Sequence, residues 1–184
     1  KLRTAQRVAA RDPFFAGNVD ALIAAQPKDL EASEIEVRLG ATWFDKKYIE
    51  QFMYETFETP RYLRGQIEIS YVPYTAEWQV SRKSMVRYND VAAFTTYGTD
   101  RASAYRLLED ALNLRDIRIY DTIEDADGRE RRVLNAKETT LAAQKQQLIR
   151  DAFKDWIWKD PERRETLVRQ YNEEMNSTRP REYD

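Results

Sequence analysis

The residues with the clearest potential for chemistry lie between positions 61 and 87, where cationic and aromatic side chains alternate. This segment carries five cations and two carboxylates, so its net charge is +3, whereas the whole chain carries −2. Cationic side chains bind phosphates and aromatic rings stack on bases, so the segment is a candidate nucleic-acid-binding site. The alternative interpretation is that the aromatic side chains form core and the cations protect strand edges. The candidate residues are Arg61, Arg64, Arg82, Lys83 and Arg87, together with the ring of Tyr74; Tyr71 and Trp78 lie in the same stretch.

Composition excludes many other kinds of site. The chain has 184 residues and contains no histidine and no cysteine. A disulfide, a thiolate nucleophile, a zinc finger, a Ser-His-Asp triad and a histidine base therefore cannot form. The five glycines form neither a phosphate-binding loop nor a dinucleotide fingerprint. We therefore expect no catalytic residue and no cofactor in this chain, although a pair of carboxylates acting as acid and base stays open.

The acidic stretch 121–127 resembles a metal-binding loop only superficially. If Gly128 took the sixth position of a calcium loop, positions one and twelve would be Ile123 and Leu134, which are not ligands. A solvated hairpin tip is the preferred interpretation, with a looser divalent site as the alternative. Residues 45–47, an acid followed two positions later by lysine, fit a helix start better than a nuclease site. We therefore predict no metal site.

Two antiparallel hairpins are predicted in the middle of the chain. Apolar and polar residues alternate over 67–71 and again over 77–80, and the turn residues 73–76 separate them. A second pair of strands is expected over 117–123 and 131–135, with a tight turn at Asp127-Gly128.

Helices are predicted on either side of these hairpins. Asp45 is the expected cap of a helix that runs to Phe57, and Asp100 the expected cap of a helix over 101–112 that stops at Asn113. A short helix capped by Asn18 is expected near the N-terminus. From about residue 137 the spacing of apolar residues is helical, with a break at Asp160-Pro161.

The order of elements predicts an α+β fold in which antiparallel β-hairpins pack with several helices and the C-terminal third is helical. We divide the chain into an N-terminal helical segment (1–30), an α+β core with two hairpins (31–136) and C-terminal helices (137–184). Trp156 and Trp158 cannot share one helix face, so Trp156 is assigned to the core and Trp158 is a candidate for docking a neighbouring domain. No apolar run is long enough to cross a membrane, and the ends suggest a piece of a longer protein.

Six stretches of the sequence are similar to one known family. They resemble a segment of the very large bacterial proteins, encoded by conjugative elements and phages, that join an adenine-specific DNA methyltransferase-like region to a Swi/Snf-type helicase. The similar segment lies between these two regions, just before the helicase. The stretches are 37–44 (VRLGATWF), 48–57 (YIEQFMYETF), 74–78 (YTAEW), 113–116 (NLRD), 134–140 (LNAKETT) and 171–176 (YNEEMN).

The resemblance implies a context rather than an active site. It implies the bacterial cytoplasm, DNA and the flanking helicase and methyltransferase-like domains as partners, and ATP, Mg and S-adenosylmethionine as ligands of those flanking domains only. The first expected function is a non-catalytic accessory domain that assists DNA engagement. The alternative is a module that braces the two flanking domains without touching DNA, and a free-standing enzyme that uses carboxylates is the third hypothesis.

Overall fold

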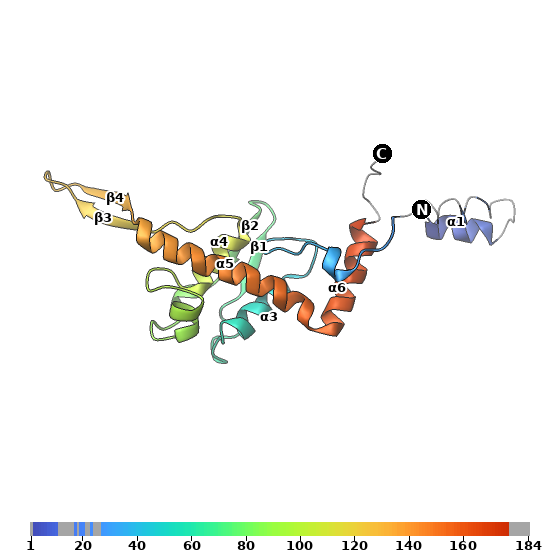
Figure 1. The fold of residues 1–184 in the computed structure, drawn as a ribbon, viewed down its shortest axis with the longest axis horizontal. Helices are drawn as coiled ribbons and strands as arrows, with labels where there is room; N and C mark the ends of the chain where they lie inside the picture. The colour runs from blue at the N-terminus through green and yellow to red at the C-terminus, as the bar shows by residue number, and fades with distance from the viewer. Residues whose placement is uncertain (1, 11–16, 18, 21–22, 24–26, 177–184) are drawn as a thin grey trace. The chain divides into compact units, whose positions relative to one another are not determined.

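The computed structural model describes residues 2–10, 17, 19–20, 23 and 27–176 (Figure 1). Two small antiparallel hairpins lie among the helices and the C-terminal part is helical, which confirms the predicted α+β fold. The backbone divides into two compact units, residues 36–164 and residues 1–35 with 165–184. The predicted cap Asn18 lies outside the described residues. No helix in the part of the chain that the structure describes is long and apolar enough to span a membrane.

Helix α3 (Lys46–Thr56) begins where the sequence predicts. The side chain of Asp45 accepts a hydrogen bond of 2.8 Å from the Lys47 N–H, which satisfies one of the free donors of the first turn. Ile49, Phe52 and Met53 form the buried face of this helix. The helix therefore contributes one wall of the core of residues 36–164.

Helix α4 (Ala104–Leu112) begins three residues later than predicted. Its cap is Ser103, whose hydroxyl accepts from the Arg106 N–H, and the predicted cap Asp100 was wrong. The reason is a tight turn in which the backbone N–H groups of Thr99 and Ala102 each donate to the other residue's carbonyl. This turn uses the backbone groups that an earlier helix start would need. The predicted stop at Asn113 is confirmed.

The two hairpins differ sharply in burial. In the first, β1 (Ile69–Val72) pairs with β2 (Glu77–Val80) in the register Ile69↔Val80, and Ile69, Trp78 and Val80 are buried. In the second, β3 (Tyr120–Glu124) pairs with β4 (Glu130–Leu134) around a turn at Gly128, and every residue from 122 to 134 is exposed. The first hairpin is part of the core, and the second is a ribbon with solvent on both faces.

The second hairpin starts later than predicted: apart from one bond, from the Asn135 N–H to the Ile119 carbonyl, residues 117–119 pair with no strand among the described residues. Ile117 and Ile119 are buried as their alternation suggested, but their N–H groups donate to side chains of helix α5. The acceptors are Gln146 Oε1, at 3.3 Å, and Thr139 Oγ1, at 2.9 Å. The helix therefore supplies the acceptors that a neighbouring strand would otherwise provide.

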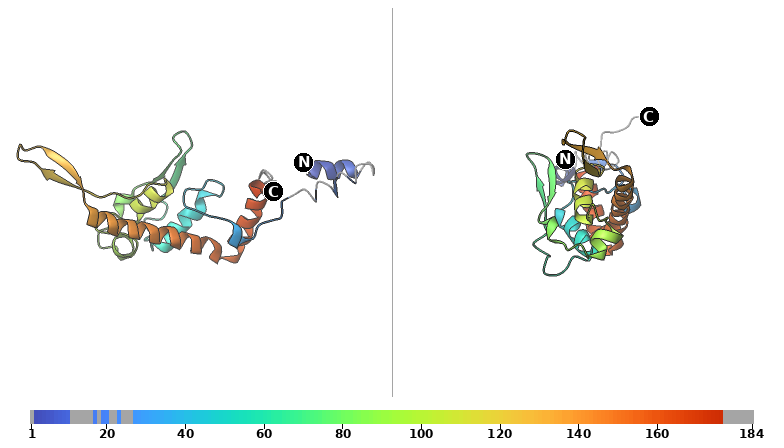
Figure 2. Two further views of the ribbon diagram at one scale, coloured as in Figure 1. Left: turned by 45° about the horizontal axis from the view of Figure 1, so that its top comes forward. Right: turned by 90° about the vertical axis from the view of Figure 1, so that its left-hand side faces the viewer.

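Helix α5 (Ala136–Lys159) runs along α3 and α4, and hairpin β3–β4 extends from its N-terminal end (Figures 1 and 2). Asn135 caps it by accepting from the Glu138 N–H. Asp160 then ends α5 and caps α6 (Pro161–Glu174) by accepting from the Arg163 N–H at 2.7 Å, with Pro161 as the first helical residue, as predicted. The shorter elements are the α-helix α1 (Leu2–Ala9), the 3-10 helices η2 (Ala32–Glu34) and η3 (Lys83–Met85), and the π-helix η4 (Ala92–Thr96).

In the smaller unit, two asparagines of the C-terminal segment bind the backbone of residues 28–30. Asn172 accepts from the Leu30 N–H at 2.8 Å and donates to the Leu30 carbonyl at 2.9 Å. Asn176 donates to the Lys28 carbonyl and is buried. Such paired side chain–backbone bonds fix residues 28–30 against the chain's last described turns.

Candidate nucleic-acid interface

The β1–β2 hairpin is fixed on its β1 edge by side chains of helix α3. Glu50 Oε2 accepts from the Ile69 N–H at 3.0 Å, and Lys46 Nζ donates to the Ile69 carbonyl at 2.8 Å. The two side chains bind the backbone groups that a third strand would bind. The β1 edge is therefore closed at this position without another strand.

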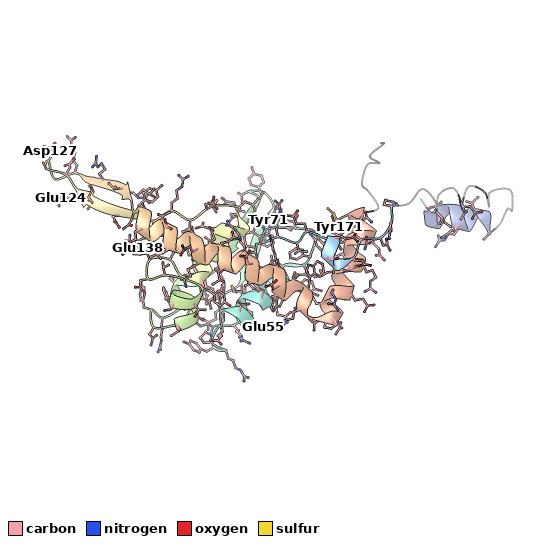
Figure 3. All side chains as sticks on the ribbon, in the orientation of Figure 1. Glu55, Tyr71, Glu124, Asp127, Glu138 and Tyr171 are labelled. Carbon is pink, nitrogen blue, oxygen red and sulfur yellow. The ribbon has the colours of Figure 1, made fainter. Side chains whose placement is uncertain are left out.

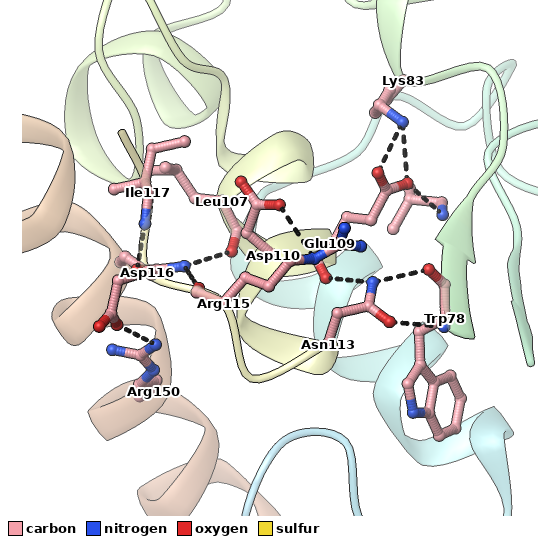
Figure 4. A network of polar contacts seen from close by, with 12 residues as sticks. Trp78, Lys83, Leu107, Glu109, Asp110, Asn113, Arg115, Asp116, Ile117 and Arg150 are labelled. Carbon is pink, nitrogen blue, oxygen red and sulfur yellow. Dashed lines mark hydrogen bonds and ion pairs between the residues drawn. The ribbon is translucent and has the colours of Figure 1, made fainter. Parts of the chain in front are cut away.

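The β2 edge is closed in the same way by helix α4 (Figure 4). Asn113 accepts from the Trp78 N–H and donates to the Trp78 carbonyl, both at 2.8 Å. Glu109 Oε2 accepts from the Val80 N–H at 2.8 Å. Because both edges are bound to helices, the hairpin tip and the loops at the hairpin base are its parts available to a partner.

Arg64, one of the predicted phosphate ligands, has a structural role. Its Nε donates to the Thr59 carbonyl at 2.9 Å, Nη2 donates to the Tyr54 carbonyl at 3.4 Å, and the guanidinium lies 5.9 Å from the centre of the Tyr54 ring. The Tyr54 hydroxyl also donates to the Ile67 carbonyl and accepts from the Gly65 N–H. Arg64 and Tyr54 thus hold the loop between α3 and β1.

Lys83, a second predicted ligand, is neutralised by helix α4. Its Nζ donates to both carboxylate oxygens of Glu109, at 2.9 and 2.8 Å (Figure 4). The same carboxylate binds the backbone of Val80. A phosphate would have to displace a two-oxygen ion pair to reach this lysine, so Lys83 is a poor phosphate ligand.

The other three predicted arginines are exposed and make no ion pair with any described residue. Arg61 lies in the loop after α3, and Arg87 follows η3. Arg82 has a left-handed backbone (φ 48°) and makes one weak bond of 3.4 Å to Gln66 Oε1. Their guanidinium groups keep most of their donors for another molecule.

The three aromatic residues noted in the sequence divide between the core and the surface. Tyr74, at the hairpin tip, is 98% exposed. Trp78 is buried and Tyr71 packs on it with ring centroids 4.9 Å apart, and Figure 3 labels Tyr71 on the hairpin. The interpretation of these aromatics as core residues is therefore correct for Trp78, whereas Tyr71 is half-buried against it and Tyr74 presents its ring to solvent.

Sequence reasoning missed two further exposed rings. Tyr62 is 62% exposed and Tyr88 is 84% exposed, and the Tyr88 ring packs on Phe94 with centroids 5.2 Å apart. Each follows an exposed arginine directly, as Arg61-Tyr62 and Arg87-Tyr88. This repeated Arg-Tyr dipeptide was the available signal. We refer to the six exposed residues as the arginine–tyrosine set: Arg61, Tyr62, Tyr74, Arg82, Arg87 and Tyr88.

Tyr62, Arg82 and Tyr74 lie at the two ends of the β1–β2 hairpin. At the base of the hairpin, the Gln66 side chain donates to the Tyr62 carbonyl at 2.6 Å and accepts from Arg82. Tyr62 and Arg82 therefore lie near each other. Tyr74 lies in the turn at the opposite end, beyond strand β1, which spans roughly 10 Å from Ile69 to Val72 at the rise of a β-strand. The arrangement suits an elongated partner better than a small ligand.

The resolved pKa shifts belong to residues outside the arginine–tyrosine set. Burial raises the pKa of the Tyr105 hydroxyl to about 12, and it shares a hydrogen bond of 2.6 Å with Thr59. Burial also raises the pKa of Asp110, against the opposing effects of Arg106 and Arg115. Among the described residues Asp110 is the one carboxyl group with a raised pKa, and no group of three carboxylates within them can hold a metal ion.

The two tryptophans near the end of α5 flank the buried Ile157 and are each half-buried. Trp156 packs on Phe52 and donates to Glu55 at 2.7 Å, and Arg163 lies 3.6 Å from the centre of a Trp156 ring. Burial lowers the pKa of Arg163. Trp158, the predicted docking residue, keeps part of its ring in solvent.

The acidic residues from Glu124 to Asp127 form the end of hairpin β3–β4, as expected for a solvated tip, whereas Asp121 lies near its base. Glu124 and Asp127 lie at its far end (Figure 3). Asp125 Oδ1 accepts from the N–H groups of Asp127 and Arg129 and so closes the turn. At the base, hydrogen bonds from Arg101 and then Asn135 lower the pKa of Asp121.

Residues 38–177 match the model of one protein family, described as Domain of unknown function (DUF8437). The match covers most of the chain, so the protein belongs to this family. The matched region includes both hairpins and helices α3 to α6. No curated protein and no solved structure matches the chain.

Proposed function

We propose that this domain is a non-catalytic accessory domain that binds DNA through the arginine–tyrosine set, within a larger bacterial, cytoplasmic helicase and methyltransferase-like protein. The observation that carries the proposal is that Arg61, Arg82 and Arg87 are exposed and form no ion pair with any described residue. They lie in a segment with a net charge of +3, in a chain whose net charge is −2. ATP, Mg and S-adenosylmethionine would bind to the flanking domains.

Titration of labelled DNA by fluorescence anisotropy at several salt concentrations tests the proposal. Three phosphate contacts predict that log K falls against log salt with a slope of about −2 to −3. The triple variant R61Q/R82Q/R87Q should remove most of this slope. A DNA affinity that is independent of salt, or unchanged in the variant, would refute the assignment.

A matched control comes from hairpin β3–β4. The variant R129Q/R131Q/R132Q removes the same number of positive charges from an exposed part of the chain. If binding depends on local phosphate contacts, this variant keeps nearly the wild-type affinity and slope. Equal losses in the two variants would mean that only the total charge matters, which contradicts the proposal.

The second candidate function is bracing between the flanking domains. Hairpin β3–β4 supports it, because Ile123, Val133 and Leu134 are between 38% and 48% exposed on a ribbon with no covered face. Trp158 on α5 is a further candidate contact. Within the longer protein, W158A would then increase protease cutting between domains, whereas an unchanged digestion pattern would count against bracing through this residue.

A further inference from the structure

Three tyrosines of the arginine–tyrosine set present most of their side chains to solvent. An aromatic side chain normally buries a large area, yet Tyr62, Tyr74 and Tyr88 expose 62%, 98% and 84% of theirs. They do not belong to one local cluster, because they lie in the α3–β1 loop, at the hairpin tip and after η3. Three separated rings that each face solvent suit a partner that offers several separate flat surfaces.

A cation accompanies two of the three rings. Arg61 precedes Tyr62 and Arg87 precedes Tyr88, and these arginines make no ion pair with a described residue. Tyr88 also rests on Phe94, at a ring-centroid distance of 5.2 Å, which restricts its motion. A cation next to a supported ring is the arrangement that binds one phosphate and stacks one base.

The form of nucleic acid follows from what the rings can reach. In a duplex the base faces are stacked on each other, so exposed tyrosines would find phosphates and groove edges only. In a single strand the base faces are free, and stacking on tyrosine does not depend on sequence. A flexible strand can also follow residues that are separated by the roughly 10 Å length of strand β1 or more.

We infer that the arginine–tyrosine set binds single-stranded DNA, with Tyr62, Tyr74 and Tyr88 as stacking platforms for separate bases along the strand and Arg61, Arg82 and Arg87 as phosphate ligands. This inference rests on the proposed DNA-binding function and adds the strand form and the stacking role. It gives the domain a preference for the unpaired strand that a helicase produces.

The test measures the affinity of the intact domain for three labelled probes. They are a 20-nucleotide thymidine strand, a duplex of equal length, and an abasic strand of equal length that keeps the phosphates. We expect the thymidine strand to bind at least about fivefold more tightly than the abasic strand, which is the lower end of the effect of one stacked base. Equal affinity for the thymidine and abasic strands, or tighter binding to the duplex, would overturn the inference.

Substitutions separate stacking from charge. The variant Y62A/Y74A/Y88A should lose at least about fivefold in affinity for the thymidine strand, since it removes the stacking that the abasic strand lacks, and its affinity for the abasic strand should not change. The variant Y62F/Y74F/Y88F keeps the rings and should stay within about twofold of wild type. Equal losses in the alanine and phenylalanine variants would refute stacking, and thermal melting checks that both variants fold.

The outcomes also separate this inference from the proposed function. If R61Q/R82Q/R87Q loses affinity and the tyrosine variants do not, the domain binds DNA by charge alone and only the present inference falls. If none of the three probes binds at tens of micromolar, both fall, and the exposed tyrosines are then assigned to a protein contact.

Discussion

A single buried glutamine links helix α5 to two other parts of the core. Gln146 is 1% exposed, and its amide Nε2 donates to the Arg115 carbonyl at 2.9 Å and to the Leu107 carbonyl at 3.4 Å. Its Oε1 accepts from the Ile117 N–H. We predict that Gln146→Leu, which keeps a similar volume, destabilises the domain markedly.

The magnitude follows from the backbone groups that would lose their partner. The Ile117 N–H is buried and has Gln146 as its acceptor, and the Arg115 carbonyl makes the shortest bond of the three. An unsatisfied buried backbone group costs about 1 to 3 kcal/mol, and the added leucine methyl groups recover part of this. We therefore expect the free energy of unfolding to fall by about 2 to 4 kcal/mol.

Urea denaturation followed by circular dichroism measures this change. Gln147→Leu is the matched control, because Gln147 is the next residue of α5, is exposed, and its side chain bonds to the exposed Asp151 on the same helix. The control should change the free energy of unfolding by less than about 0.5 kcal/mol. A Gln146→Leu variant within that same range would show that water or backbone shifts satisfy the freed groups, and the reasoning would be wrong.

Three further predictions concern stability and exposure. A Cβ on Gly40 would collide with the Leu112 carbonyl oxygen, whereas a Cβ on Gly65, which also has a positive φ, would meet no atom within 4 Å. Thermal melts should therefore show that Gly40→Ala lowers the free energy of unfolding by at least about 3 kcal/mol and Gly65→Ala by about 1 kcal/mol. Equal losses in the two variants would contradict the clash. The pKa of Tyr105 is about 12 in the folded state and about 10 in the unfolded chain, so only the unfolded chain loses this proton between pH 10 and 12. The free energy of unfolding therefore falls in this range by up to about 1.4 kcal/mol per pH unit. Tyr105→Phe should remove that part of the pH dependence, and an unchanged slope above pH 10 would argue against the raised pKa. Limited trypsin digestion should make its first cut within residues 36–164 in the exposed strand β4, after Arg131 or Arg132, as mass spectrometry would show; a first cut in the loop after α3 would contradict this.

Local signals in the sequence predicted much of the fold. Asp45, Asn113 and Asp160-Pro161 mark helix ends through bonds to residues a few positions away, so a short window contains the information. The start of α4 was misplaced because the turn at Thr99 competes with the cap. The strand status of residues 117–119 depends on whether another strand lies beside them, which no local pattern reveals.

The candidate site, like the fold, could be predicted from local sequence only in part. Local charge identified the arginines of segment 61–87, but only the tertiary structure shows that Lys83 is paired with Glu109, 26 positions away, and that Arg64 binds backbone carbonyls. Trp78 and Tyr74 lie four positions apart in one hairpin, and one is buried while the other is 98% exposed. Residue type alone cannot separate ligands from core when the pairing register and the covering helices decide exposure.

The solvent-exposed ribbon β3–β4 also sets how this family can vary in length. Its residues from 122 to 134 contribute no buried side chain, and Asp125 closes the tip without help from the core. Because both faces of the ribbon meet solvent, a change in its length or in its register moves no side chain into or out of the core. Relatives are therefore expected to differ in length here, and the tip is the natural position for inserting a fluorescent label or an epitope.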